Sequence, residues 1–367
     1  MKISAALATA PHAELEFREV DLDAPRPHEV LVEIKGVGLC HTDLAARDGI
    51  YGLPYPMVLG HEGSGIVVAV GSEVTSVRPG DAVALSFSSC GSCTPCSNGR
   101  PAYCSRFTEE NYIGTRPDGS TLMSDEQGVV HSHFFGQSSF ATHAIANERN
   151  VVKVDPELAE LVGPLGCGLQ TGAGAVMRSM ACRPGSSLVI LGAGPVGLAA
   201  VMGAVIQGCA EIIVVEPHAT RRDLALELGA TRALDPGAGS VVGQVFELVP
   251  AGVDYVFDTT GRVEMIKQGI DAVASNAVVG LVGVPADFSV DLPLNIVATM
   301  QKGLSVKGIV EGDSDPQVFV PELVEHYKAG RFPFDRLITT FPLAQINEAI
   351  EAQHRGEVVK VVLVPDS

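Results

Sequence analysis

Four cysteines lie within fifteen residues of one another in the first third of this 367-residue chain. Cys90, Cys93, Cys96 and Cys104 have the spacing C-x2-C-x2-C-x7-C. Four thiolates on one short loop can hold a tetrahedral zinc ion, and a site filled in this way leaves no position for a substrate. The alternatives are an iron–sulfur cluster, whose bacterial spacing ends in x3-Cys-Pro and is absent here, and free thiols. The loop therefore predicts a structural zinc site.

Three other segments contain metal-binding residue types. They are Cys40-His41-Thr42-Asp43, Gly60-His61-Glu62-Gly63 and the Gly-rich segment 163–168, which contains Cys167. The three candidate ligands are 21 and 106 residues apart, so their spacing alone does not join them into one site. Taken singly, each has an ordinary structural explanation, such as a buried thiol or a hydrogen-bonded histidine.

A glycine-rich turn marks the second half of the chain. Gly192, Gly194 and Gly197 form a GxGxxG pattern between the β-type run SLVIL and a helical run. These glycines allow a tight turn, close approach to a diphosphate and helix–strand packing, and the helix N-terminus attracts the phosphates. Glu216 ends the next strand, where it can accept hydrogen bonds from ribose hydroxyls and repel a 2′-phosphate, which favours NAD. Arg221 either lies near that ribose or is a solvated helix charge.

Composition excludes several classes of function. The chain has 43 acidic and 25 basic residues, a net charge of −18, so nucleic acid and anionic membrane surfaces are unfavourable partners. Residues 184–210 carry no charge, but a strand, a turn and a helix explain their glycines better than a membrane span does. The N-terminus fits a first strand better than a signal peptide. Without a secretory signal, closely spaced cysteines indicate a metal site rather than disulfides, and we expect a cytoplasmic location.

The pattern of elements predicts two domains. The first ~150 residues contain short β-branched runs broken by Gly, Pro and Asp, and the polar segment 107–139 is expected to be a long surface excursion. From about Thr171, strands alternate with helices, which implies a parallel sheet covered on both faces. We expect six strands, and their sequences are SLVIL, EIIVVE, TRALD, VDYVFDTTG, AVVGLVGVP and LSVKGIV. We therefore expect an α/β doubly wound dinucleotide fold.

The order CHTD, GHEGSGIVVAVG, the four-cysteine loop, GCG and GAGPVG resembles the zinc-dependent medium-chain alcohol dehydrogenases over essentially the whole chain. The resemblance implies a GroES-like, mostly-β catalytic domain at residues 1–168 and 306–367. It implies a Rossmann domain with a doubly wound, parallel six-stranded sheet at residues 169–305. It also implies NAD and two Zn²⁺ ions per chain.

The same resemblance implies the roles of the residues near the catalytic metal. Cys40, His61 and Cys167 match the catalytic zinc ligands, which leave an open position where a Lewis acid can activate an alcohol oxygen. Asp43 matches the carboxylate that orients the ligand histidine, and Glu62 the carboxylate behind the metal.

Further positions are carried over from the family in the same way. Thr42 matches the hydroxyl that takes the alcohol proton. Ala45 stands where the family has a histidine that passes this proton to solvent. The proton must therefore leave by another route, either through ribose and water or through another base such as His41. Residues that match cofactor contacts are His41, Thr171, Val196, Val282, Val284 and Lys360. An exposed strand-end lysine is the alternative for Lys360.

Within the family, GPLGCGLQTGAGAV and FFGQSSFATHA resemble the bacterial aryl-alcohol and allylic terpene alcohol dehydrogenases. We therefore expect reversible oxidation of primary aromatic or allylic alcohols to aldehydes. The alternatives are a glutathione-dependent formaldehyde dehydrogenase, an aliphatic alcohol dehydrogenase and, more remotely, a non-catalytic NAD-binding protein. A zinc-free quinone or enone reductase would lack the Cys and His ligands. Family relatives are homodimers or homotetramers, and the partner is expected to be a small alcohol or aldehyde.

Overall fold

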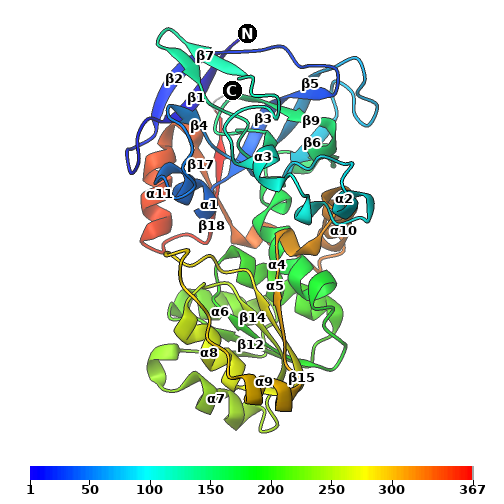
Figure 1. Ribbon diagram of the computed structural model, residues 1–367, viewed down its shortest axis with the longest axis vertical. Coiled ribbons are helices and arrows are strands. Elements are labelled where there is room, and N and C mark those ends of the chain that lie inside the picture. Colours follow the sequence, from blue (N-terminus) through cyan, green and yellow to red (C-terminus); the bar gives the residue numbers. More distant parts are fainter. Residues whose placement is uncertain (366–367) are drawn as a thin grey trace. The chain divides into compact units, whose positions relative to one another are not determined.

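The computed structural model describes residues 1–365 in two compact units (Figure 1). Unit 1 comprises Met1–Gly168, Asp315–Glu325 and the chain from Asp335 on, and unit 2 comprises Leu169–Ser314 and His326–Phe334. Residues 306–314, which were expected in the first domain, group with unit 2. The reason is that β16 (Ser305–Gly308) pairs in parallel with β15 (Val273–Leu281).

Unit 1 is built on two largely antiparallel sheets. One has the order β4-β1-β2-β7-β8, with strands Met57–Val58, Lys2–Ala8, Glu16–Leu22, Met123–Asp125 and Gly128–Val130. The other has the order β10-β6-β5-β3-β18-β17, with strands Val151–Lys153, Ala82–Leu85, Gly63–Val70, Glu29–Gly38, Lys360–Val364 and Ile338–Pro342. β9 (His143–Asn147) also pairs with β3. The helices here are α1 (His41–Arg47), α2 (Thr94–Ser97), α3 (Phe107–Asn111) and α11 (Ile346–His354), with α10 (Pro316–Lys328) crossing into unit 2.

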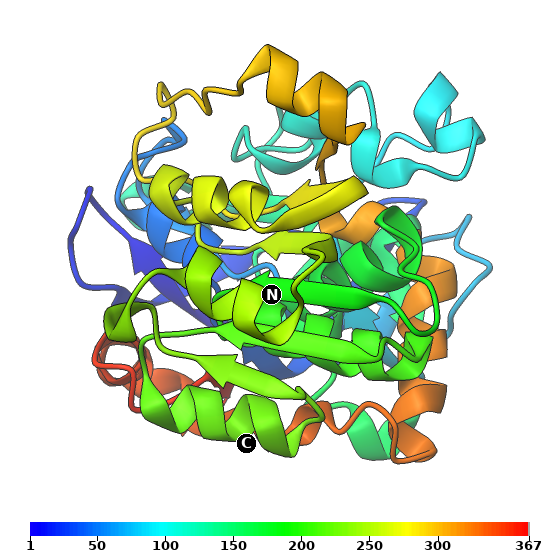
Figure 2. The same cartoon turned by 90° about the horizontal axis from the view of Figure 1, so that it is seen from below.

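Unit 2 contains the predicted parallel sheet. Its six strands have the order β13-β12-β11-β14-β15-β16, and Figure 2 shows them side by side. The first four span Arg232–Leu234, Glu211–Val215, Ser187–Leu191 and Val253–Asp258. The helices are α4 (Gly168–Gly174), α5 (Pro195–Gln207), α6 (Ala219–Glu227), α7 (Val241–Leu248), α8 (Val263–Asp271) and α9 (Ile296–Lys302). All five residues of β11 are buried, as expected of a central strand with both faces covered, so the doubly wound prediction is confirmed.

The uncharged stretch 184–210 forms β11, the glycine turn and α5. Pro195 occupies the first helical position, and Gly208 ends the helix in the left-handed conformation (φ 75°). Eight of the thirteen helix residues are buried, which explains their apolar character without a bilayer. Among residues 1–365, no helix combines the length and the apolar character needed to cross a membrane.

The expectation of a surface excursion at residues 107–139 is wrong for residues 130–139, which are buried apart from the intermediate His131. Phe134 and Phe135 are at most 3% exposed, and Gln137 is 1% exposed. Two adjacent phenylalanines bury enough apolar surface to draw this polar, glycine-rich segment into the core of unit 1. Three short helices assigned to unit 2, α4, α7 and α9, were not predicted from the sequence.

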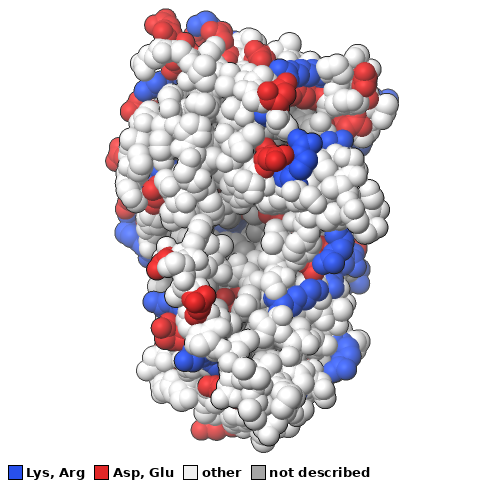
Figure 3. Space-filling model, in the orientation of Figure 1, with Lys and Arg blue, Asp and Glu red and all other residues white. Residues whose placement is uncertain are grey.

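Charged side chains lie mainly at the surface. Figure 3 shows scattered clusters of charged groups, several with acidic and basic residues side by side, and broad uncharged areas between the clusters on the face in view. Glu62 and Lys360 are exceptions, because they are 0% and 1% exposed and belong to the site described next.

Candidate active site and metal centres

The three ligands predicted for a catalytic metal come together in unit 1. The candidate ligand atoms of Cys40, His61, Cys167 and Glu62 all lie within 4.8 Å of one another. Cys40 follows β3 and caps α1, His61 lies just before β5, and Cys167 follows the short turn Gly163–Gly166. Residues 106 positions apart thus meet where a strand end, a loop and a turn converge.

The ring of His61 is oriented so that Nε2 can bind a metal. His61 Nδ1 lies 2.8 Å from Asp43 Oδ1, while Nε2 is buried and has no hydrogen-bond partner among residues 1–365. An unpaired buried imidazole nitrogen beside two cysteine sulfurs is costly unless a cation completes the site. The donor set therefore fits a zinc ion held by two sulfurs and one nitrogen.

The electrostatics favour the metal-binding form of Cys40. The neighbouring Cys167 thiol, the His61 ring and the positive charge of Lys360 hold the pKa of the Cys40 thiol well below its usual value, and together they outweigh burial. A thiolate is the form that binds zinc. Behind the ligands, Lys360 Nζ lies 2.5 Å from Glu62 Oε2 and also donates to the Leu39 carbonyl, a pairing that the sequence did not predict.

The proposed proton acceptor lies beside the first ligand. Thr42 Oγ1 is 3.8 Å from Cys40 Sγ, and the threonine is half-buried at the start of α1. His41, the adjacent residue, is exposed, and Ala45 is buried. Tyr51 was not singled out from the sequence, yet its environment belongs to this site. Burial and the charges of Cys40 and Asp43 raise its pKa to about 12, opposed by a hydrogen bond with Thr42.

An aromatic cluster packs against the ligand histidine. Phe135 stacks on His61 with ring centroids 4.5 Å apart, and Phe134 approaches it edge-on at 5.6 Å. Tyr112 contacts Phe135 at 5.1 Å and Tyr51 at 4.9 Å. Aromatic side chains thus connect the metal cluster with the segment after α3. The sequence signal for this contact is the Phe-Phe pair, in a segment whose polar composition predicts a surface location.

Gln137 holds the backbone of the ligand histidine. Its Nε2 donates to the His61 carbonyl at 2.8 Å, and its Oε1 accepts from Gly63 N at 3.0 Å and Ser139 Oγ at 2.7 Å. A fully buried amide with both ends satisfied fixes its surroundings. Gln137 therefore positions His61 from the main-chain side, as Asp43 does from the ring side.

The four-cysteine loop also closes on itself. The sulfurs of Cys90, Cys93, Cys96 and Cys104 lie within 4.8 Å of one another. Backbone N–H groups point at the sulfurs, including Cys93 N to Cys90 Sγ at 3.4 Å and Cys90 N to Cys104 Sγ at 3.3 Å. Such donors stabilise thiolates. Four sulfurs at these separations fit a tetrahedral zinc ion with no open position.

The glycine fingerprint in unit 2 has the geometry of a phosphate-binding turn. Gly192 has φ 98°, and a Cβ on Gly197 would lie 2.0 Å from the Gly192 carbonyl oxygen. A Cβ on Gly194 would meet nothing within 4 Å, so the backbone there is open at the N-terminus of α5. The space and the helix N-terminus fit a diphosphate.

Glu216 lies at the carboxyl end of β12 and is 4% exposed. Its two oxygens accept hydrogen bonds from Ala193 N at 2.8 Å and His218 N at 3.0 Å. The carboxylate is thereby fixed beside the fingerprint turn. Arg221, on α6, has a buried Nε without a partner in the described part of the chain.

The remaining predicted cofactor residues occupy several parts of the fold. Val196 is half-buried in the first turn of α5, and Val282 and Val284 follow β15. Thr171, in α4, is 6% exposed. Their contacts with NAD stay predictions, as does that of Lys360, which pairs with Glu62 in unit 1.

Comparison with known proteins agrees with this geometry. Residues 26–156 match the family described as alcohol dehydrogenase GroES-like domain, and residues 195–327 match zinc-binding dehydrogenase. The chain is 47% identical to geraniol dehydrogenase from Castellaniella defragrans, covering 95% of this chain and 94% of the relative.

Two solved structures are similar along their whole length. An alcohol dehydrogenase zinc-binding domain protein from Burkholderia ambifaria has a TM-score of 0.98 at 45% identity. Benzyl alcohol dehydrogenase from Acinetobacter calcoaceticus has a TM-score of 0.96 at 40% identity. Both comparisons cover 100% of each chain.

Proposed function

Because the chain belongs to the zinc-binding alcohol dehydrogenases, we propose that it oxidises primary aromatic or allylic alcohols to aldehydes with NAD, reversibly. The observation that carries the substrate class is the similarity to geraniol dehydrogenase, at 47% identity over 95% of this chain, and to benzyl alcohol dehydrogenase, at 40% identity over all of it.

Different residues of the site have different roles in alcohol oxidation. When bound, zinc supplies a Lewis acid for the alcohol oxygen and NAD supplies the hydride acceptor. Cys40, His61 and Cys167 would hold the metal, and Asp43 keeps the imidazole in the binding orientation. Thr42 would take the hydroxyl proton, because its oxygen lies beside the first ligand.

Glu216 supports NAD as the cofactor. Its carboxylate is buried, fixed by two backbone N–H groups and close to the fingerprint turn. A fixed negative charge at the end of the second strand favours free ribose hydroxyls and disfavours a 2′-phosphate.

A substrate with a ring or an isoprenoid chain gains binding energy from apolar burial. Rings that stack or meet edge to face contribute beyond their area burial, and apolar burial adds about 25 cal/mol per Å². Conjugation in the product aldehyde also stabilises the charge that develops as hydride leaves. Ethanol gains neither effect.

The test is kcat/KM with NAD at one pH for ethanol, hexanol, benzyl alcohol, geraniol and S-(hydroxymethyl)glutathione. We expect benzyl alcohol and geraniol to exceed ethanol by at least tenfold. A larger value for ethanol, or for the glutathione adduct, would refute the aryl or allylic class and leave the zinc dehydrogenase assignment intact. An aliphatic enzyme would instead favour hexanol.

We propose that the protein forms a homodimer or homotetramer through the edge of the unit 2 sheet. β16 is the edge strand, and nearby α9 exposes Ile296 (82%), Met300 (72%) and Val297 (55%). Exposed apolar groups beside an unpaired strand edge favour pairing with a second copy.

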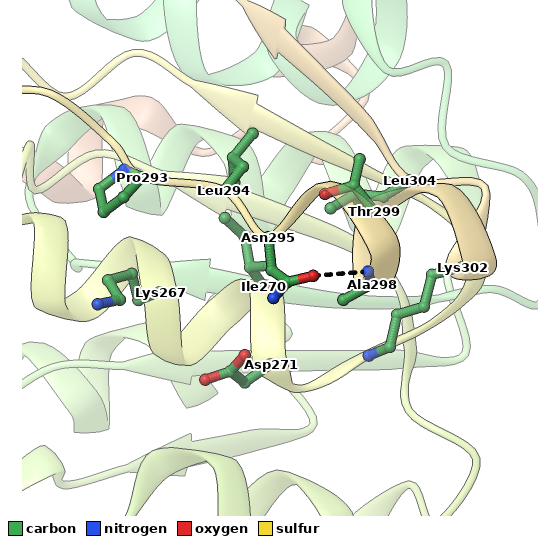
Figure 4. Close-up of a pocket in the computed structure, with 10 residues that line it drawn as sticks. All are labelled: Lys267, Ile270, Asp271, Pro293, Leu294, Asn295, Ala298, Thr299, Lys302 and Leu304. Atoms are coloured by element: carbon green, nitrogen blue, oxygen red, sulfur yellow. Dashed lines mark hydrogen bonds between the residues drawn. The ribbon is translucent and has the colours of Figure 1, made fainter.

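A cavity of about 370 Å³ lies beside α9 (Figure 4). Ile270, Leu294 and Leu304 contribute apolar lining, and Asn295 caps α9 by accepting from Ala298 N at 2.9 Å. None of the fingerprint residues lines it, so it is not the dinucleotide site. Its position beside the exposed apolar helix fits an interface between copies.

Sedimentation of the Ile296→Glu variant tests the oligomer. The variant should shift toward monomer, whereas Val318→Glu, at a residue 61% exposed on α10, should not. An unchanged sedimentation coefficient for Ile296→Glu would place the interface elsewhere. We also propose the cytoplasm as the location, because a reducing compartment keeps the clustered cysteines available to metals.

A further inference from the structure

Two cysteines of unit 2, Cys182 and Cys209, belong to neither of the metal-type clusters found among residues 1–365. Cys182 follows the π-helical segment Ala175–Ser179, and Cys209 follows the C-terminus of α5. We propose that they form a redox modification site, in which a hydroperoxide oxidises the two thiols to an intramolecular disulfide.

The backbone brings the two cysteines together. Gly185 N donates to the Gly208 carbonyl at 2.7 Å, which joins the segments that follow Cys182 and precede Cys209. Gln207 Nε2 donates to the Cys182 carbonyl at 3.3 Å, so the end of α5 is also tied to Cys182 itself. Both contacts connect the entry to β11 with the end of α5.

The thiols are placed for two different tasks. Cys182 is 1% exposed, whereas Cys209 is half-buried between two exposed residues, so an oxidant reaches Cys209 first. Ser186 Oγ lies 3.6 Å from Cys209 Sγ and donates to it. Hydrogen bonding with Cys182, opposed by burial, lowers the pKa of Cys209 to about 7, whereas hydrogen bonding with Cys209 and burial both raise the pKa of Cys182. Cys209 is therefore the nucleophile and Cys182 the resolving thiol.

The reaction balances in two steps. The Cys209 thiolate attacks a hydroperoxide, the O–O bond breaks, and sulfenic acid and an alcohol or water form after protonation. The Cys182 sulfur then attacks the sulfenic sulfur, the S–O bond breaks, and the thiol proton leaves with the hydroxyl as water. Two electrons pass from the thiols to the peroxide, and a dithiol returns them by thiol–disulfide exchange.

The disulfide would close a loop that contains β11, the fingerprint turn and α5. A crosslink across such a loop lowers the conformational entropy of the unfolded chain. It therefore raises the melting temperature of the protein when the native geometry is unstrained. Neither cysteine is a candidate zinc ligand, so the metal sites need not take part.

The zinc-loaded protein tests the site directly. It is treated with hydrogen peroxide, alkylated and digested with trypsin, which leaves both cysteines in the single peptide 179–221 because Arg183 precedes Pro184. We expect this peptide to lack two hydrogen atoms and to carry no alkyl group. Dithiothreitol should restore two alkylation sites. Two alkylated cysteines after peroxide, or irreversible oxidation of Cys209 with Cys182 free, would overturn the proposal.

Two variants separate the tasks of the thiols. In Cys182→Ala, Cys209 should accumulate as sulfenic acid that dimedone traps, because no resolving thiol remains. In Cys209→Ser, Cys182 should stay reduced and alkylate after unfolding. Sulfenic acid on Cys182 in that variant would contradict the assignment. If either variant fails to fold, the wild-type peptide masses still decide the proposal.

Discussion

The carboxylate of Asp43 ties together the two halves of the candidate catalytic metal site. Its Oδ1 lies 2.8 Å from His61 Nδ1 and accepts from Gly60 N, while Oδ2 accepts from Cys40 N at 3.0 Å. Asp43 and His61 are 1% and 0% exposed. One buried side chain thus fixes both the ring of one ligand and the main chain of another.

Replacing Asp43 with Asn should weaken the catalytic zinc by about 10- to 100-fold, because the amide is a poorer partner for the imidazole N–H. Zinc affinity is measured by competition with a chromogenic chelator. Asp48→Asn, at the end of the same helix, is the matched control and should keep wild-type affinity. Equal affinities for both variants would show that Asp43 does not orient the ligand.

The two metal sites should respond differently to loss of a ligand. Cys93→Ser opens a site with four sulfur ligands and should lower the melting temperature or the yield of folded protein. His61→Ala should leave a folded chain that binds NAD and carries about one zinc, but does not oxidise alcohol. Zinc content, thermal unfolding and cofactor titration distinguish the two, and an active His61→Ala protein would refute the catalytic assignment.

Glu216→Ser should reduce the ratio of NAD to NADP efficiency by about tenfold or more, because it removes the repulsion of a 2′-phosphate. It also frees Ala193 N and His218 N, which the carboxylate holds. Glu216→Gln is therefore the sharper variant, since it keeps an acceptor oxygen and removes the charge. A ratio unchanged in both variants, from steady-state kinetics, would place the discrimination elsewhere.

Thr42→Ala should abolish most turnover, whereas Thr42→Ser should keep much of it, because only the hydroxyl is required for proton removal. Thr42→Val preserves the shape of the side chain and is the control for packing. Its kcat with benzyl alcohol should match that of the alanine variant. Near-normal oxidation by Thr42→Val would rule out the threonine as the proton acceptor.

Local sequence rules predicted much of unit 2. SLVIL, the glycine turn and Pro195 specify a strand, a turn and a helix within one short segment, so no distant contact is needed to recognise them. AVVGLVGVP predicted a strand about four residues too late, because β15 begins at Val273 and ends at Leu281. Element boundaries depend on pairing with neighbours, which a single segment does not encode.

The candidate catalytic site was predictable only by resemblance. Cys40, His61 and Cys167 converge through β3, a loop and a turn, and no local pattern specifies that convergence. The aromatic contact of Phe135 with His61 was missed for the same reason. The composition of segment 107–139 is polar on average, and burial of its two phenylalanines depends on tertiary packing.

Acid should destabilise the protein through His133, which is 6% exposed. Burial lowers its pKa to about 4, with Arg116 adding to the effect and Glu29 opposing it. Because the unfolded histidine titrates near pH 6.5, the unfolded chain binds more protons between pH 6.5 and about 4. The contribution of His133 to the free energy of unfolding is therefore fully present above pH 6.5 and is lost as the pH falls to about 4. The loss amounts to roughly 3 kcal/mol at most.

The variant His133→Asn isolates this contribution. Asn tolerates the left-handed backbone at this position (φ 68°) and carries no titrating group. Its free energy of unfolding should fall less than that of the wild type between pH 7 and pH 5, in denaturant titrations at each pH. His12→Asn is the matched control, since His12 is also left-handed (φ 62°) but its side chain is 75% exposed. If the control and His133→Asn lose stability equally with acid, the buried histidine is not the source of the pH dependence.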